Sequence, residues 1–189
     1  MRRQSAVKKR YHLHKAVALV GMMGSGKTAV GRAIAQRLSV PFRDSDQAIE
    51  AAAQSTIAEI FARDGEPFFR DREAEVIARL LTDEPAIIST GGGAFLAARN
   101  REKIEGAGVA LWLDASVGIL WERVRHRDTR PLLRTENPRK TLEELHKVRA
   151  PIYQLAGLRL QAIGGQSVEE TASRAVALLL TRPDVLEEI

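Results

Sequence analysis

The segment at 21–28, GMMGSGKT, places the tightest constraint on the fold, because it matches the pattern G-x-x-x-x-G-K-[ST] at every defined position. The residues before it, 15–21, read KAVALVG, an apolar run that is typical of a strand buried on both faces. After it, apolar side chains recur at helical spacing, at Val30, Ala33, Ile34 and Leu38. The chain therefore opens with a strand, a glycine-rich loop and a helix, the arrangement that surrounds a phosphate-binding turn.

Short apolar runs continue this alternation along the rest of the chain. Further strands are predicted at 40–43, 86–89, 108–113 and 158–163, and helices at 56–63, 66–81 and 116–127. A last helix begins after Ser167, where Glu170 completes a capping box. Five short strands alternating with helices predict an α/β fold with three layers, α/β/α, around a central five-stranded parallel sheet.

The net charge of +5 is unevenly distributed along the chain. Of the 29 Lys and Arg, six lie within residues 1–15, which hold no acid, and the chain has 24 Asp and Glu. The sequence from 16 onward is therefore slightly acidic. We expect residues 1–15 to be a flexible basic tail, residues 16–182 to form a single domain, and residues 183–189 to be a frayed C-terminal end.

Composition excludes several classes of protein. The chain has no cysteine, which rules out a disulfide scaffold, a Cys metal site and a Cys nucleophile. No apolar run approaches the ~20 residues of a membrane helix, and the basic start lacks the apolar stretch of a secretory signal. We expect a cytoplasmic monomer that binds neither membranes nor nucleic acid, since no nucleic-acid motif is present.

The glycine-rich loop predicts the binding of a nucleoside triphosphate. Gly21, Gly24 and Gly26 allow backbone angles that present N–H groups to phosphate oxygens. In such loops the lysine, here Lys27, reaches the β- and γ-phosphates, and the hydroxyl, here Thr28, ligates Mg²⁺. A GTPase, a motor ATPase and a small-molecule kinase all use this loop. The length of 189 residues favours the kinase, because so short a chain has little room for transduction machinery.

Three further clusters are candidates for the second substrate's site. Asp44-Ser45-Asp46 follows the second strand, where it could bind a ligand at the sheet edge or simply cap the next helix. The triple glycine 91–93 could admit a ligand close to the backbone or form an ordinary loop. Arg70, which lies beside two phenylalanines and three residues before Glu73, could bind an anion or form a surface ion pair.

Taken together and in this order, these clusters resemble the shikimate kinase family. The matching segments are GMMGSGKTAVGR at 21–32, DSD at 44–46, GEPFFRDRE at 65–73, STGGGA at 89–94, RPLL at 130–133 and RAPIY at 149–153. The resemblance covers about residues 16–180. It implies a P-loop kinase fold, similar to nucleoside monophosphate kinases, with a substrate-binding helical segment at about 44–72 and a lid at about 123–137. The reaction it implies is transfer of the ATP γ-phosphoryl group to the 3-hydroxyl of shikimate.

The resemblance also implies roles for individual residues. ATP would be bound by Gly24, Ser25, Gly26, Lys27, Thr28, Ala29, Arg125 and Arg130. Mg²⁺ would be held directly by Thr28, and through water by Asp44 and Ser89. Shikimate would be bound by Asp46, Arg70, Gly91, Gly92, Gly93 and Arg149, within walls formed by Phe61 and Phe69, while Glu73 would hold Arg70. Lys27, Asp46 and Arg130 would be the catalytic residues, and Asp46 would either orient or deprotonate the attacking hydroxyl.

Some assignments stay open at this point. Arg123, Arg125 and Arg127 are all candidates for stacking on adenine, and we favour Arg125. A kinase of another small hydroxy acid, such as gluconate, would share the size, fold and phosphate loop. A nucleotide-binding regulatory module that uses the basic tail is a further alternative. The segment 123–149 carries nine Lys and Arg against four acids and contains no strand-like run, so we expect a mobile basic segment there.

Overall fold

The computed structural model describes residues 10–126 and 131–189. Its main sheet has five parallel strands in the order β3-β4-β2-β5-β6. These strands are β2 (Ala16–Val20), β3 (Phe42–Asp44), β4 (Ile87–Ser89), β5 (Gly108–Asp114) and β6 (Leu158–Gln161). The α-helices are α1 (Lys27–Leu38), α2 (Ser45–Ala53), α3 (Ile57–Thr82), α4 (Ala98–Ala107), α5 (Val117–Val124), α6 (Pro138–Tyr153) and α7 (Val168–Leu179). Two 3₁₀ turns are η1 (Ala94–Leu96) and η2 (Pro131–Leu133).

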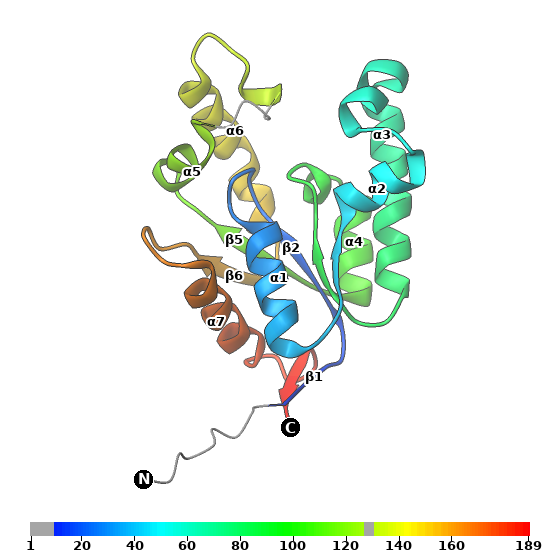
Figure 1. The fold of residues 1–189 in the computed structure, drawn as a ribbon, viewed down its shortest axis with the longest axis vertical. Helices are drawn as coiled ribbons and strands as arrows, with labels where there is room; N and C mark the ends of the chain where they lie inside the picture. Colours follow the sequence, from blue (N-terminus) through cyan, green and yellow to red (C-terminus); the bar gives the residue numbers. More distant parts are fainter. Residues whose placement is uncertain (1–9, 127–130) are drawn as a thin grey trace.

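Helices cover both faces of this sheet, which confirms the predicted three-layer α/β/α fold (Figure 1). On β2, Ala18 and Val20 pack into the core beneath α3 and α4, whereas Val17 and Leu19 pack into the core beneath α1 and α7. All five residues of β2 are buried, as the uninterrupted apolar run predicts for a central parallel strand. The strand order switches direction beside β2, so the loop after β2 opens at the edge where ligands bind in such sheets.

The long helix α3 contains a break that the sequence predicts as a gap between two helices. Gly65 has φ 83° and ψ 172°, outside the helical region, and Pro67 follows in the first turn of the second half. The predicted helices 56–63 and 66–81 therefore meet at this glycine. The break turns the first half of α3 toward α2, and these two elements form one side of the upper end of the molecule in Figure 1.

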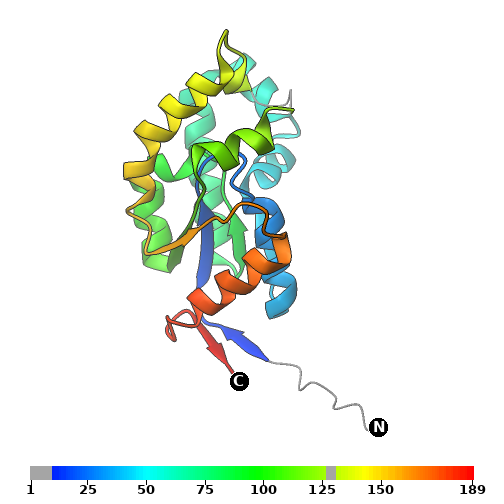
Figure 2. The same cartoon turned by 90° about the vertical axis from the view of Figure 1, so that its left-hand side faces the viewer.

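Both ends of the domain differ from the prediction. Residues 11–13 form strand β1 (Tyr11–Leu13), which pairs antiparallel with β7 (Leu186–Glu188), and Figure 2 shows the two strands side by side. The expected tail boundary at 15 and the expected frayed end are therefore wrong. Leu13 and Leu186 are buried against the core shared with α1 and α7, and this apolar contact orders both segments. Residues 1–9 lie outside the described part of the chain.

The basic segment 123–149 is also more regular than expected. Its second half lies in α6, which begins at Pro138 after Asn137 caps the helix by accepting a hydrogen bond from the Lys140 amide. Leu142 and Tyr153 anchor this helix in the core.

Within the described residues, no helix is both long enough and apolar enough to cross a membrane.

Candidate active site

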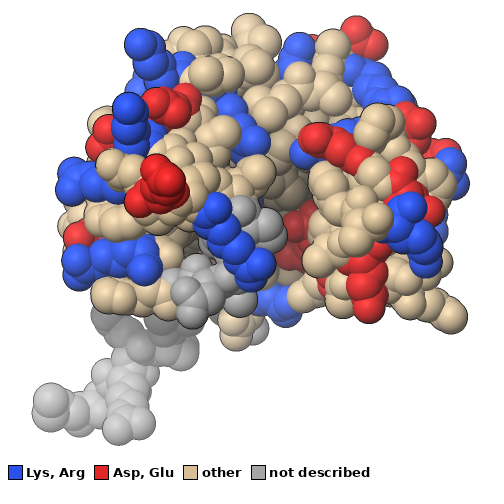
Figure 3. Space-filling model, turned by 90° about the horizontal axis from the view of Figure 1, so that it is seen from above, with Lys and Arg blue, Asp and Glu red and all other residues tan. Residues whose placement is uncertain are grey.

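A cavity of about 680 Å³ opens at the carboxyl edge of the main sheet. Its lining includes the loop after β2, the first turn of α1, the ends of β3 and β4, and the segment that joins β6 to α7. Viewed from above, this edge is hollowed between the part that carries α5 and α6 and the part that carries α2 and α3 (Figure 3). The volume lies within the range of small-molecule sites.

The phosphate loop forms the floor of this cavity. Gly21, Gly24 and Gly26 have φ values of 141°, 78° and 94°, which residues with a side chain rarely adopt. A Cβ atom at Gly24 would lie 2.6 Å from Val124, so α5 also requires a glycine there. The expected ATP-binding residues of this loop all line the cavity: Gly24, Ser25, Gly26, Lys27, Thr28 and Ala29.

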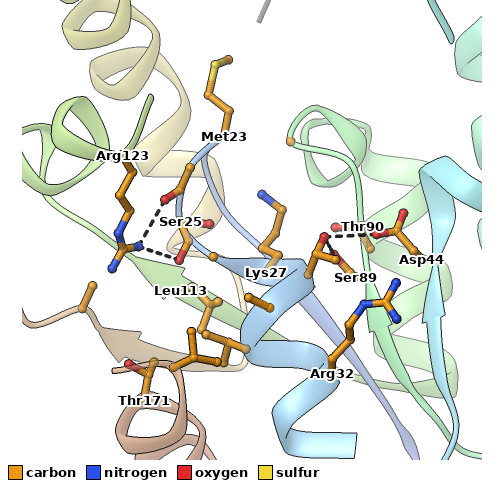
Figure 4. Close-up of a pocket in the computed structure, with 18 of the residues that line it drawn as sticks. Met23, Ser25, Lys27, Arg32, Asp44, Ser89, Thr90, Leu113, Arg123 and Thr171 are labelled. Carbon is orange, nitrogen blue, oxygen red and sulfur yellow. Dashed lines mark hydrogen bonds between the residues drawn. The ribbon is translucent and has the colours of Figure 1, made fainter. Parts of the chain in front are cut away.

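Lys27 is the cation at the centre of the loop. Its Nζ donates hydrogen bonds to the carbonyl oxygens of Gly21, at 2.8 Å, and Met22, at 2.9 Å. Figure 4 shows its side chain in the cavity between Arg123 and Asp44. The side chain is only 9% exposed, so its charge is largely removed from bulk water and acts strongly on a nearby anion.

Three oxygen-bearing side chains meet beside the first turn of α1. The Thr28 hydroxyl donates to Asp44 Oδ2 at 3.1 Å and lies 3.3 Å from the Ser89 hydroxyl. Oxygen atoms of this kind suit Mg²⁺. In the described part of the chain, no group of three or more His, Cys, Asp or Glu could hold a metal by itself. The arrangement therefore fits an ion that is bound jointly with phosphate oxygens.

Asp44 also serves the alternative role considered for it. Its Oδ1 accepts hydrogen bonds from the Asp46 and Gln47 amides and so caps α2. The same carboxylate thus caps a helix with one oxygen and reaches Thr28 with the other. Asp44 can therefore cap α2 and face a ligand at the sheet edge at the same time.

The triple glycine is packed against the charged side chains of the second substrate's candidate site. A Cβ atom at Gly91 would lie 2.8 Å from Asp46 Oδ1, and one at Gly93 would lie 2.6 Å from Arg70 Nη2. At Gly92 the added atom would lie 3.9 Å from Arg149 Nη1. These predicted residues come from α2, α3, the loop after β4, and α6, and the fold brings them together.

Two acidic side chains in this cluster are shielded from water, Glu73 fully and Asp46 in part. Glu73 is 1% exposed and accepts a hydrogen bond from Arg70 Nη1 at 2.8 Å. Burial nevertheless raises the pKa of Glu73, because its effect exceeds the opposing effect of Arg70. Burial also raises the pKa of Asp46, followed by the negative charge of Asp44, against the lowering effect of Lys27. Raised pKa values in a cleft are typical of functional carboxylates.

Aromatic side chains support the two arginines. Phe61 and Phe69 lie with ring centroids 4.7 Å apart, and the Arg70 guanidinium lies 5.2 Å from the Phe69 ring. The Tyr153 hydroxyl donates to the Gly92 carbonyl and so ties α6 to the triple glycine. Its phenol lies beside Arg149, and burial raises its pKa. No role was predicted for Tyr153 from sequence, although this residue lies within the RAPIY segment.

The arginines expected near the nucleotide differ in where the structure places them. Arg125 pairs with Glu122 at 3.0 Å on the outside of α5, whereas Arg123 lines the cavity and donates to the Gly24 and Ser25 carbonyls, at 3.2 Å each. Of the candidates for the nucleotide, Arg123 is therefore the one that the described residues place there. Arg130, like Arg127, lies outside the described residues.

The far end of the cavity was missed from sequence. Its lining residues there are Leu113, Leu160, Ala162, Gln166, Val168 and Thr171. They follow or end the strands β5 and β6 at the same edge as the phosphate loop. The rule that parallel strands carry ligands at their carboxyl ends could have found them.

Comparison with known proteins agrees with this site. The family model described as shikimate kinase matches residues 23–180. The chain belongs to the shikimate kinase family. The shikimate kinase of Ruegeria pomeroyi is 60% identical over 175 residues, which cover 93% of this chain and 90% of the relative. Members of the family are phosphotransferases with an alcohol group as the acceptor.

Solved structures support the same assignment. The shikimate kinase from Acinetobacter baumannii in complex with shikimate is 36% identical, with a TM-score of 0.83, covering 88% of this chain and 93% of that one. A gluconokinase from Sinorhizobium meliloti has a TM-score of 0.60 at 21% identity, covering 92% of this chain and 95% of that one. At that identity the second similarity shows a shared fold alone.

Proposed function

We propose that this member of the family transfers the γ-phosphoryl group of ATP to the 3-hydroxyl of shikimate, giving shikimate 3-phosphate and ADP. The observation that carries this proposal is the meeting of Asp46, Arg70 and Arg149 around the triple glycine, whose first two residues line the same cavity as the phosphate loop. One carboxylate and two guanidinium groups suit a polyhydroxylated substrate that itself bears a carboxylate.

The phosphate loop would bind ATP through backbone amides, the start of α1 and Lys27. When phosphates are bound, the Lys27 ammonium would exchange its bonds to the Gly21 and Met22 carbonyls for bonds to phosphate oxygens. This exchange keeps the buried ammonium hydrogen-bonded and places its charge where negative charge shifts during transfer.

The three oxygens beside α1 fit a magnesium ion that accompanies ATP. Thr28 would bind it directly, and Asp44 and Ser89 would hold it through water. Such an ion, when bound, screens the charge of the β- and γ-phosphates. The hydrogen bond from the Asp46 amide keeps the Asp44 carboxylate fixed relative to Thr28, so the spacing of the oxygens that would hold the ion is set by the fold.

The acceptor would be held by its carboxylate and its hydroxyls. Arg70 and Arg149 would bind the carboxylate, and Glu73 keeps the Arg70 guanidinium in place at 2.8 Å. Asp46 would accept the proton of the attacking hydroxyl, and its raised pKa makes it a stronger base than an exposed aspartate. The hydroxyl oxygen then forms a bond to the γ-phosphorus as the bond to the ADP oxygen breaks.

The role of Arg130 is proposed from the family resemblance alone, since this residue lies outside the described part of the chain. Within the expected lid at about 123–137, it would neutralise charge on the transferred group. Arg123 would lie nearer to the phosphate loop, because its guanidinium already contacts the Gly24 and Ser25 carbonyls.

A coupled assay of ADP release tests this function. The purified protein is given ATP and Mg²⁺ with shikimate, with gluconate, or with a panel of other hydroxy acids and nucleoside monophosphates. We expect saturable turnover with shikimate, and a product phosphorylated at the 3-oxygen by phosphorus NMR. Turnover with gluconate and none with shikimate would overturn the proposal and favour the hydroxy-acid kinase alternative.

A further inference from the structure

The two arginines of the acceptor half differ in the side chains that hold them. Arg70 lies 2.8 Å from a carboxylate oxygen of Glu73 and 3.4 Å from one of Glu66, so two acids offset its charge. Among the residues that the structure describes, no acid forms an ion pair with Arg149. The charge of Arg149 is therefore the less compensated of the two, and a group of another kind must keep it in place.

Tyr153 is the side chain in position to do so. It follows Arg149 by four residues on α6, so the two side chains project from the same face of the helix. Tyr153 is 0% exposed, and its ring lies 6.1 Å from the Trp112 ring, measured between centroids. A buried phenol hydroxyl needs a polar partner, and this one donates its proton to the Gly92 carbonyl.

The Tyr153 hydroxyl, Gly92 and the Arg149 guanidinium meet at one place. A Cβ atom added at Gly92 would lie 3.9 Å from Arg149 Nη1. Burial raises the pKa of Tyr153, while the charge of Arg149 and a hydrogen bond from it act in the opposite direction. A hydroxyl has one proton and two lone pairs, so the oxygen that donates to Gly92 can also accept from a guanidinium, which only donates.

A neutral partner and an acidic partner have different effects on an arginine. A carboxylate such as Glu73 fixes the guanidinium and also offsets its charge, whereas a phenol oxygen orients the group and leaves its full charge for a ligand. A guanidinium that is ordered before the ligand arrives also costs less entropy on binding. Arg70 is therefore the better neutralised of the two groups, and Arg149 is the stronger attractor of an anion.

We propose that Tyr153 is a positioning residue for Arg149: its hydroxyl oxygen accepts a hydrogen bond from the guanidinium and holds it beside the triple glycine, where the acceptor's carboxylate would bind. The same oxygen donates to Gly92, so it sets the distance between the arginine and this backbone. Only the identity of the carboxylate rests on the proposed function, since the order of Arg149 is a property of the free protein.

NMR relaxation of the free protein tests this inference before any acceptor is chosen. The Arg149 Nε–H signal is assigned by its loss in Arg149→Lys. We expect an order parameter of about 0.8 in the wild type and below about 0.6 in Tyr153→Phe, which keeps the ring and its packing on Trp112. Tyr11→Phe, on β1, is the matched control and should leave the value unchanged. Equal order of Arg149 in the wild type and in Tyr153→Phe would overturn the inference, whichever acceptor the enzyme uses.

Steady-state kinetics separate positioning from a merely structural role. Tyr153→Phe should raise KM for shikimate by about three- to tenfold and leave KM for ATP within about twofold. In the double variant with Arg149→Ala, loss of the hydroxyl should cost nothing further, because no guanidinium is left to hold. Additive losses, or an equal rise of both KM values, would overturn the proposal. If the wild type shows no turnover of shikimate, the proposed function fails, and the order of Arg149 still decides the role of Tyr153.

Discussion

The two halves of the active site are built in opposite ways. The phosphate loop is one run of residues between β2 and α1, and the ligand groups that we propose for it are mostly backbone amides positioned by glycine. The acceptor half draws Asp46, Arg70 and Arg149 from three different helices. The phosphate loop is therefore formed by residues that are adjacent in sequence, whereas the acceptor half is assembled by the tertiary structure.

The halves also differ in electrostatics. The loop uses a single cation, Lys27, bonded to neutral carbonyls. The acceptor half holds charged groups of both signs close together, and burial raises the pKa of Asp46 and of Glu73. Ionised carboxylates are costly to bury, so the acceptor half should limit stability in a way that the loop does not.

The largest expected effect comes from the loop. Lys27→Ala should lower kcat by about a thousandfold, because a charge that stabilises the transferring group is lost. The affinity for shikimate should stay within about twofold, since the acceptor arginines are untouched. The ADP-release assay and direct binding measure the two quantities, with Lys103→Ala on α4 as the control. Near-native kcat would mean that the loop is not catalytic.

Asp46→Asn should separate activity from stability. Loss of the base should lower kcat about a hundredfold. Because the folded state raises the pKa of Asp46, the ionised carboxylate is destabilising at neutral pH, and this cost disappears as the pH falls through the raised pKa. The variant should therefore have a higher free energy of unfolding at pH 7, measured by urea denaturation.

The same pKa sets a pH dependence for the wild type. Turnover should fall on acidification as Asp46 becomes protonated, at a pH above the ordinary aspartate value of about 3.9. Asp71→Asn changes an exposed partner of Arg99 and serves as the control. Equal stability of Asp46→Asn and wild type at every pH would contradict the burial cost.

Arg149→Ala should act on the acceptor alone. Removing one guanidinium from the proposed carboxylate site should raise KM for shikimate by about ten- to fiftyfold and leave KM for ATP unchanged. Arg139→Ala, on the first turns of the same helix, tests for a general disturbance of α6. A fall in ATP affinity would place Arg149 in the nucleotide half and break the distinction between the two halves.

The smallest effect is expected at Glu73, which touches the acceptor only through Arg70. Glu73→Gln should raise KM for shikimate by about three- to tenfold, because Arg70 keeps an acceptor but loses a charged partner. Arg72 and Glu75 form an exposed pair with the same spacing on α3, so Glu75→Gln is a matched control. An equal effect of the two variants would show that burial of the pair has no importance.

The contrast between a segment formed locally and a site assembled from distant helices also explains what could be predicted from sequence. The layers and the five central strands follow from apolar runs and from the loop, because both are local signals. The β1–β7 pair could not be found, since each of these strands has only one buried residue and neither forms an apolar run. Helix α6 was hidden by its high charge, although Asn137 and Pro138 were available as a start signal.

For the site, most residues predicted from sequence lie in motifs, although Tyr153 of the RAPIY segment was assigned no role. Lys27, Asp46, Arg70 and Arg149 stand in segments that resemble the family. The fold places Lys27 and Asp46 in one cavity, and it places the two arginines beside the triple glycine at its edge. Gln166 stands in no motif. It lines the far end of the cavity, and its hydrogen bond from Arg174 on α7 is visible only in the structure.

The pairing of β1 with β7 has a practical consequence for engineering. The Ile189 amide donates to the Arg10 carbonyl at 2.9 Å, so residues 10 and 189 are already neighbours, at the end of the molecule opposite the hollow. A short linker joining them, with new termini opened in the exposed turn at 83–84, would give a circular permutant. Such a chain should retain both halves of the site, because the cut and the join lie outside every contact that builds them.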